Sequence, residues 1–241
     1  MDRIESKGNE TAVRKFIAVT IYAIAMGYLE SAVVIYLRQT AFGSSPNGSL
    51  QDFQVFPIRF LEPKLGAVEF VREAATIIML LAVGYLAGKN RFRQIMFFVY
   101  SFAVWDIFYY MFLRLFTGWP SSLGDFDVLF LIPVIWVSPV VCPILISLLL
   151  TFASAILIFL STKSENVRIN TINLCFFLLG SGIEFYSFTG QIFRILFQQG
   201  PKGLETFSPT SFNWPLFFVG YLLLCISAIK TIRDFYHKMT S

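Results

Sequence analysis

Six stretches of about twenty mainly apolar residues restrict this chain to a membrane fold, because each stretch matches the thickness of the hydrocarbon core. Hydrophobic residues make up 56% of the sequence and charged residues 14%, whereas a soluble domain has roughly 25% charged residues. The stretches lie at about 16–37, 66–88, 95–116, 143–161, 169–188 and 212–232. The sequence therefore predicts an all-α, polytopic membrane helix bundle of about six transmembrane helices. One transmembrane domain, 16–232, lies between an N-terminal tail, 1–15, and a C-terminal tail, 233–241.

The basic residues predict the orientation of the bundle. Alternate connections carry twelve Lys and Arg residues on one side and six on the other. The twelve are Arg3, Lys7, Arg14, Lys15, Lys89, Arg91, Arg93, Lys163, Arg168, Lys230, Arg233 and Lys238, and the six are Arg38, Arg59, Lys64, Arg114, Arg194 and Lys202. The positive-inside rule then places both tails of this multi-pass protein in the cytoplasm. The N-terminal tail is expected to be flexible, and the first apolar stretch is expected to be a retained helix rather than a signal peptide.

Three connections on the opposite side are unusual. Residues 39–65 form a long loop rich in Gly, Ser and Pro. Residues 127–142 are apolar but contain Pro133 and Pro139, which break a helix, so an interfacial or re-entrant segment that does not cross the membrane is expected there. Gln191–Gln199 has the pattern of an amphipathic surface helix.

Charged residues inside the apolar spans are the best lead to function. Six of them fall in the half of the membrane away from the predicted cytoplasmic side: Glu30, Glu69, Arg72, Glu73, Asp106 and Glu184. A charge that faces lipid at mid-membrane costs about 2.5–3.5 kcal/mol, so these side chains are expected to gather in one polar cavity. The candidate cavity residues are Glu30, Arg38, Glu69, Arg72, Glu73, Asp106, Tyr109, Tyr110 and Glu184.

Spacing gives these residues two interpretations each. Glu69, Arg72 and Glu73 stand at i, i+3 and i+4 and therefore share a helix face. This arrangement is typical either of a structural ion pair or of a site that binds an anionic group. Asp106 has Tyr109 and Tyr110 on its own helix face. Its carboxylate is expected either to form structural hydrogen bonds between helices or to transfer protons. We also expect the Arg72 guanidinium to form a hydrogen bond with a carboxylate on another helix. The small neighbours of Glu30, and the glycines before Glu184, predict close helix packing at both sites.

The sequence lacks the side chains that several common types of catalytic and metal site require. His237 is the single histidine and lies in the C-terminal tail, so His-ligated haem, zinc-hydrolase and Ser-His-Asp sites are excluded. Cys142, Cys175 and Cys225 are isolated and support neither disulfides nor a zinc site. Nucleotide-binding motifs are absent and the basic residues are scattered, so neither a cofactor nor a nucleic-acid partner is expected.

Four blocks of the sequence carry a resemblance to a known family. They are Gly27-Tyr28-Leu29-Glu30-Ser31-Ala32-Val33-Val34, Arg72-Glu73-Ala74-Ala75-Thr76, Val104-Trp105-Asp106-Ile107-Phe108-Tyr109-Tyr110, and Gly118-Trp119-Pro120 through Asp127-Val128-Leu129-Phe130-Leu131-Ile132-Pro133. Over roughly residues 20–150 the chain resembles an uncharacterised family of bacterial multi-spanning membrane proteins. The resemblance implies a prokaryotic inner-membrane location and nothing about a substrate.

The sequence leaves three functions open. The first is the binding or movement of a small cation or a proton-coupled solute, because the cavity would offer oxygen ligands and one guanidinium. The second is a membrane enzyme that acts on a lipid or isoprenoid at the outer leaflet, with Asp106, Glu30 or Glu73 as acid or base. The third is an accessory subunit whose charges pair with a partner subunit, or with a second copy in a homo-oligomer. Whether the protein is an enzyme is left open, and the lipid bilayer is the one partner that all three share.

Overall fold

Six long helices and one β-hairpin form the part of the chain that the computed structural model describes, residues 2–42, 55–56, 63–162 and 169–240. In chain order the elements are α1 (Asp2–Phe42), α2 (Pro63–Ala87), α3 (Arg91–Thr117), β1 (Phe126–Phe130), β2 (Trp136–Pro139), α4 (Val141–Leu160), α5 (Thr171–Gln199), the short 3-10 helix η1 (Pro201–Leu204) and α6 (Trp214–Thr240). Each of the six long helices contains a span of the length and apolar character needed to cross a membrane. The predicted all-α polytopic bundle is therefore confirmed.

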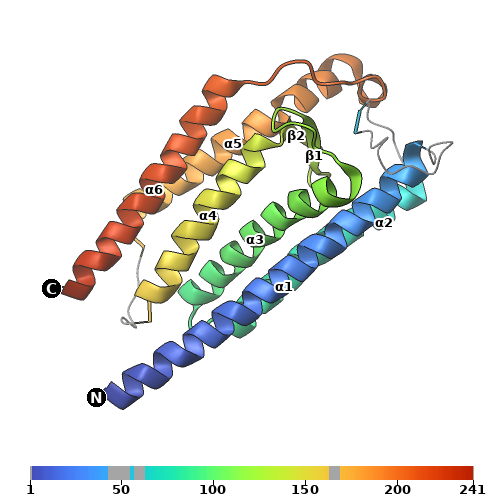
Figure 1. Ribbon diagram of the computed structural model, residues 1–241. Helices are drawn as coiled ribbons and strands as arrows, with labels where there is room; N and C mark the ends of the chain where they lie inside the picture. Colours follow the sequence, from blue (N-terminus) through green and yellow to red (C-terminus); the bar gives the residue numbers. More distant parts are fainter. Residues whose placement is uncertain (1, 43–54, 57–62, 163–168, 241) are drawn as a thin grey trace.

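Both ends of the chain lie at the same end of the bundle, as Figure 1 shows. This follows from an even number of crossings. We call it the terminal end, and the opposite one, where the hairpin lies, the distal end.

The helices form two packed groups. Helix α3 contacts α1, α2 and α4, helix α5 packs along α6, and a contact between α4 and α6 joins the groups. Glycines allow the closest approaches, since a Cβ at Gly27 of α1 would lie 2.8 Å from the carbonyl oxygen of Trp105 on α3. At Gly180 of α5 a Cβ would lie 3.0 Å from the carbonyl oxygen of Gly220 on α6. The expected close packing beside Glu30 and Glu184 is thus present.

Local signals define the ends of α3, the central helix. Asn90 caps its first turn, because its side chain accepts a hydrogen bond from the N–H of Arg93 at 2.9 Å. Gly118 ends the helix with φ 74°, and its N–H donates to the carbonyl of Arg114. Between these caps, Asp106 lies near the middle of α3, and Tyr109 and Tyr110 lie one turn closer to the distal end.

The proline-broken segment forms an antiparallel hairpin that enters the bundle from the distal end (Figure 1). It does not cross the membrane as a helix, as predicted, but its strands were not foreseen. The side chain of Phe130, at the end of β1, stacks on Phe102 at 6.2 Å and lies 6.1 Å from Trp105, midway along α3. Backbone at this depth must be paired within the protein, and the ladder between β1 and β2 supplies the pairs.

The helices α1 and α5 are longer in the structure than the sequence predicts. Gln191–Gln199 is not a separate surface helix but the continuation of α5, because Gly190 alone does not interrupt the helix and no proline follows until Pro201. Its two faces are still visible, with Ile192 buried and Phe197 88% exposed. The chain is already helical from Asp2, so α1 includes most of the stretch expected as an N-terminal tail. Most of the 39–65 loop lies outside the described residues.

Candidate functional site

Arg72 ties α1 to α2 through two carboxylates. Its Nε and Nη2 donate to the two oxygens of Glu69 at 2.8 and 2.5 Å, and its Nη1 donates to Oε2 of Glu30 at 2.6 Å. Both carboxylates are buried. Thr76, one turn further along α2, adds a longer hydrogen bond of 3.4 Å to Glu30. Arg72 therefore reaches a carboxylate of another helix, as the sequence analysis expects, besides the one on its own helix.

Glu73 has a different partner from its neighbours on α2. Its carboxylate accepts the backbone N–H of Leu131, at 2.9 and 3.2 Å, immediately after β1. This N–H belongs to the turn of the hairpin, where the strand ladder has ended. Glu73 thus supplies the acceptor that buried, non-helical backbone requires in a membrane.

Asp106 links α3 to α4. The hydroxyl of Ser147 donates to Oδ2 of Asp106 at 2.7 Å, and both residues are buried. Ser147 is a residue that the sequence analysis did not single out. A serine within an apolar helix gives little signal by itself, because serine also packs well between membrane helices.

Asp127 of β1 is the acid that sequence reasoning missed as a site residue. It is 1% exposed and accepts hydrogen bonds from the Tyr110 hydroxyl at 3.0 Å and from the Val128 N–H at 2.8 Å. The guanidinium of Arg38 lies 3.9 Å away and also donates to the Val55 carbonyl. Burial raises the pKa of Asp127 to about 6, although Arg38 and Tyr110 act in the opposite direction.

Tyr109 lies between these sets of contacts. Its ring is 4.8 Å from that of Tyr110, and the charges of Asp127, Arg38, Glu30 and Asp106 all act on its hydroxyl. The residues are therefore neighbours in one region, which we call the distal polar core. Its members are Glu30, Arg38, Glu69, Arg72, Glu73, Asp106, Tyr109, Tyr110 and Asp127. The structure groups them in adjoining hydrogen-bonded sets that meet near Tyr109.

Glu184 of α5 lies apart from this core, and its carboxylate is close to α4 and α6. Its Oε2 accepts a hydrogen bond from the Ser187 hydroxyl at 3.3 Å, whereas its Oε1 has no hydrogen-bond partner among the described residues. A Cβ at Gly220 of α6 would lie 2.8 Å from Oε1, and Cys142 of α4 is close enough for the two groups to interact electrostatically. Of the nine candidates, Glu184 is the one that the structure does not bring to the others.

Metal ligation has little support in the described part of the chain. No group of three or more His, Cys, Asp or Glu side chains there is arranged to hold a metal ion. The three cysteines are unpaired with one another, and His237 is in the last turn of α6. The oxygen atoms of the distal polar core instead bind guanidinium, hydroxyl and backbone N–H donors.

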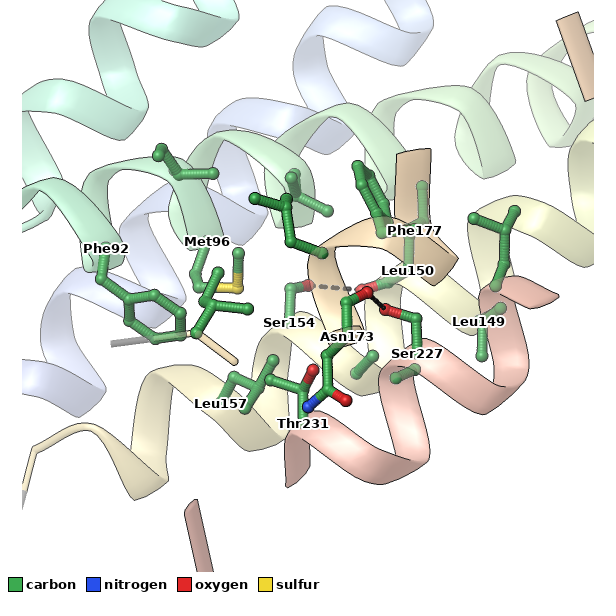
Figure 2. A pocket seen from close by; sticks show the side chains of 17 residues that line it. Phe92, Met96, Leu149, Leu150, Ser154, Leu157, Asn173, Phe177, Ser227 and Thr231 are labelled. Atoms are coloured by element: carbon green, nitrogen blue, oxygen red, sulfur yellow. Dashed lines mark hydrogen bonds between the residues drawn. The ribbon is translucent and has the colours of Figure 1, made fainter. Parts of the chain in front are cut away.

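An apolar groove of about 230 Å³ lies in the other half of the bundle, toward the terminal end. Side chains of α3, α4, α5 and α6 point into it, as Figure 2 shows, among them Met96, Leu150, Phe177 and Thr231. None of the nine candidate residues lines it. We call it the α3–α6 groove.

Comparisons with known proteins give no relative from which a function could be carried over. No family model, curated protein or solved structure matches the chain.

Proposed function

We propose that the distal polar core takes up protons and that the protein uses it to exchange protons for a small cation. One observation carries the proposal. Among the described residues, the core contains five carboxylic acids, Glu30, Glu69, Glu73, Asp106 and Asp127, but two arginines, Arg38 and Arg72. Three negative charges are left over if every group is ionised.

An excess of buried negative charge is unstable in a bilayer unless protons or cations compensate it. Hydroxyl groups of Thr76, Tyr110 and Ser147 bind the acids Glu30, Asp127 and Asp106. Hydroxyl groups can both donate and accept hydrogen bonds, so they can pass a proton between neighbouring carboxylates. This combination supports proton uptake more directly than the recognition of an anionic substrate.

The proposal includes an orientation. With both termini in the cytoplasm of a prokaryotic cell, the distal end faces the outside of the inner membrane. Protons or cations would then enter the core from outside. The charge bias of the sequence supports this orientation, with twelve basic residues in the segments predicted to be cytoplasmic and six in the segments predicted to lie outside.

Proton movement by purified protein in liposomes tests the proposal. The liposomes contain a pH-sensitive dye, and Na⁺, K⁺ or Mg²⁺ is added outside, one at a time, without any other gradient. We expect at least one cation to change the internal pH faster than in protein-free liposomes. Asp106→Asn should abolish this difference, whereas Glu205→Gln, which changes an exposed acid outside the core, should leave it intact.

Two outcomes would contradict the proposal. One is an internal pH that responds to none of the cations in liposomes that contain correctly folded protein. The other is an equal response in the wild type and the Asp106→Asn variant.

A further inference from the structure

We propose that the terminal half of the bundle binds one phospholipid with a primary-amine headgroup, whose acyl chain lies in the α3–α6 groove and whose headgroup lies in an adjoining depression. The inference goes beyond the proposed function and is independent of it, because the two regions lie in opposite halves of the bundle. It rests on the shape of the groove, the charges of the depression and one buried acceptor without a partner.

The groove suits a hydrocarbon chain. Its lining is almost wholly apolar and includes Met96 of α3 and Phe177 of α5 (Figure 2). Its volume of about 230 Å³ exceeds the roughly 150 Å³ of an engineered apolar cavity that binds benzene. Several lining side chains are exposed, including Ile95 at 55% and Leu174 at 42%. The groove is therefore open to the bilayer, and an acyl chain can enter from the side.

A depression at the terminal end continues the groove. It is lined by Ile169, Asn170, Thr171, Asp234, His237 and Lys238, and Ile169 also lines the groove. The ammonium of Lys238 and the first turn of α5, the positive end of a 29-residue helix, complement a phosphate group. The carboxylate of Asp234 complements a positive charge instead. Charges of both signs side by side match a zwitterionic headgroup better than an anionic one.

A buried amide at the junction favours an amine that can donate hydrogen bonds. Asn173 is 1% exposed and lines the groove, and its Nδ2 donates to Oδ2 of Asp234 at 2.9 Å. Its Oδ1 has no hydrogen-bond partner among the described residues. In Figure 2 this amide lies beside Thr231. A primary ammonium has three donors and can serve both Asp234 and Asn173, whereas a choline headgroup has none.

Lipid titration of the full-length protein, monitored by native mass spectrometry, tests the inference. The protein is delipidated in detergent and titrated with phosphatidylethanolamine, phosphatidylcholine and phosphatidylglycerol that carry identical acyl chains. We expect one phosphatidylethanolamine to bind about tenfold more tightly than either of the others, as one or two extra charge-assisted hydrogen bonds predict. Equal affinity for the three lipids would overturn the inference, and this comparison needs no variant.

Paired variants locate the bound lipid. Ala228→Phe fills the groove and Ile229→Phe changes the adjacent exposed position, so the first should lower the affinity about tenfold and the second should not. Asp234→Asn keeps an acceptor for Asn173 but removes the carboxylate charge, and it should abolish the preference for phosphatidylethanolamine over phosphatidylcholine. Arg233→Gln, outside the depression, is its control. Loss of affinity in the controls, or unchanged affinity in both test variants, would place the lipid elsewhere and contradict the inference.

Discussion

At the residue scale, the distal polar core depends on groups that each make more than one contact. The fork of Arg72 binds Glu69 through two nitrogens and Glu30 through a third. Asp127 accepts from Tyr110 and Val128 while it faces Arg38. Such groups are sensitive to conservative substitution, because a residue with the same charge but a different shape cannot make the same set of contacts.

Arg72→Lys should destabilise the protein although it preserves the charge. A lysine cannot span Glu69 and Glu30 with three directed N–H groups, so at least one buried carboxylate loses its donor. We expect a loss of about 1–3 kcal/mol, measured as the change in unfolding free energy in detergent micelles. Arg91→Lys, at an exposed position on α3, is the matched control and should have little effect. Equal stability of the two variants would mean that the fork contributes nothing.

Asp127→Asn should remove part of the pH dependence of stability. The pKa of Asp127 is raised from an ordinary value of 3.8 to about 6, so the folded protein holds this proton more tightly than the unfolded chain does. The resulting stability is complete below about pH 4 and is lost as the pH rises through 6. It amounts to an order of 3 kcal/mol. Thermal unfolding from pH 4 to pH 7 should show a smaller decline in the variant, and identical declines would refute this role.

At the element scale, close helix contacts and the re-entrant hairpin build the site. Helix α3 brings Asp106 and Tyr109 toward α1 because Gly27 lets the two backbones approach. The hairpin carries Asp127 into the bundle, and Glu73 of α2 holds its turn through the N–H of Leu131. The core is therefore assembled by four elements, of which one is not a helix.

Gly27→Ala should weaken the contact between α1 and α3. The added Cβ would lie 2.8 Å from the Trp105 carbonyl oxygen and 2.9 Å from the Cβ of Phe108, so one helix must shift. We expect a loss of about 1–3 kcal/mol, the usual cost of overpacking, in thermal unfolding measurements. At Gly66 of α2 nothing lies within 4 Å of an added Cβ, and Gly66→Ala should be neutral or slightly stabilising. A destabilisation at Gly66 that equals the one at Gly27 would contradict the steric explanation.

The helices and the contact of Arg72 with a second helix could be predicted from the sequence, but the hairpin and the contacts of Asp127 could not. Length and apolar composition suffice to identify a span, and the structure confirms all six. The hairpin segment was expected only to be interrupted by its prolines, because its strands depend on contacts with Phe102 and Trp105 that are distant in sequence. Similarly, the depth of Glu30 and Arg72 could be read from the sequence. Asp127 was missed because the sequence shows it beside a loop, while its partner Arg38 is on α1.

At the scale of the whole molecule, the two halves of the bundle differ in chemistry. The distal half contains the buried acids and arginines, whereas the terminal half contains the apolar α3–α6 groove. This asymmetry makes the orientation in the membrane important, because it decides from which side ions can reach the acids.

Cysteine labelling from outside the cell should establish the orientation. In a variant without Cys142, Cys175 and Cys225, Ser122→Cys in the connection before the hairpin should react with a membrane-impermeant reagent. Lys89→Cys, between α2 and α3 at the terminal end, should react only after the membrane is permeabilised. The reverse pattern would mean that the distal polar core faces the cytoplasm.

Infrared spectroscopy of the protein in lipid bilayers tests the central claim, that the distal polar core holds protons, most directly. Protonated carboxylic acids have a C=O stretching band that carboxylates lack. The Glu184→Gln variant serves as the reference protein, so that the separate acid on α5 does not contribute. At neutral pH we expect a carboxylic acid band in this reference that decreases when Asp106→Asn is added. A spectrum without such a band would show that all five acids are ionised, and it would contradict the account.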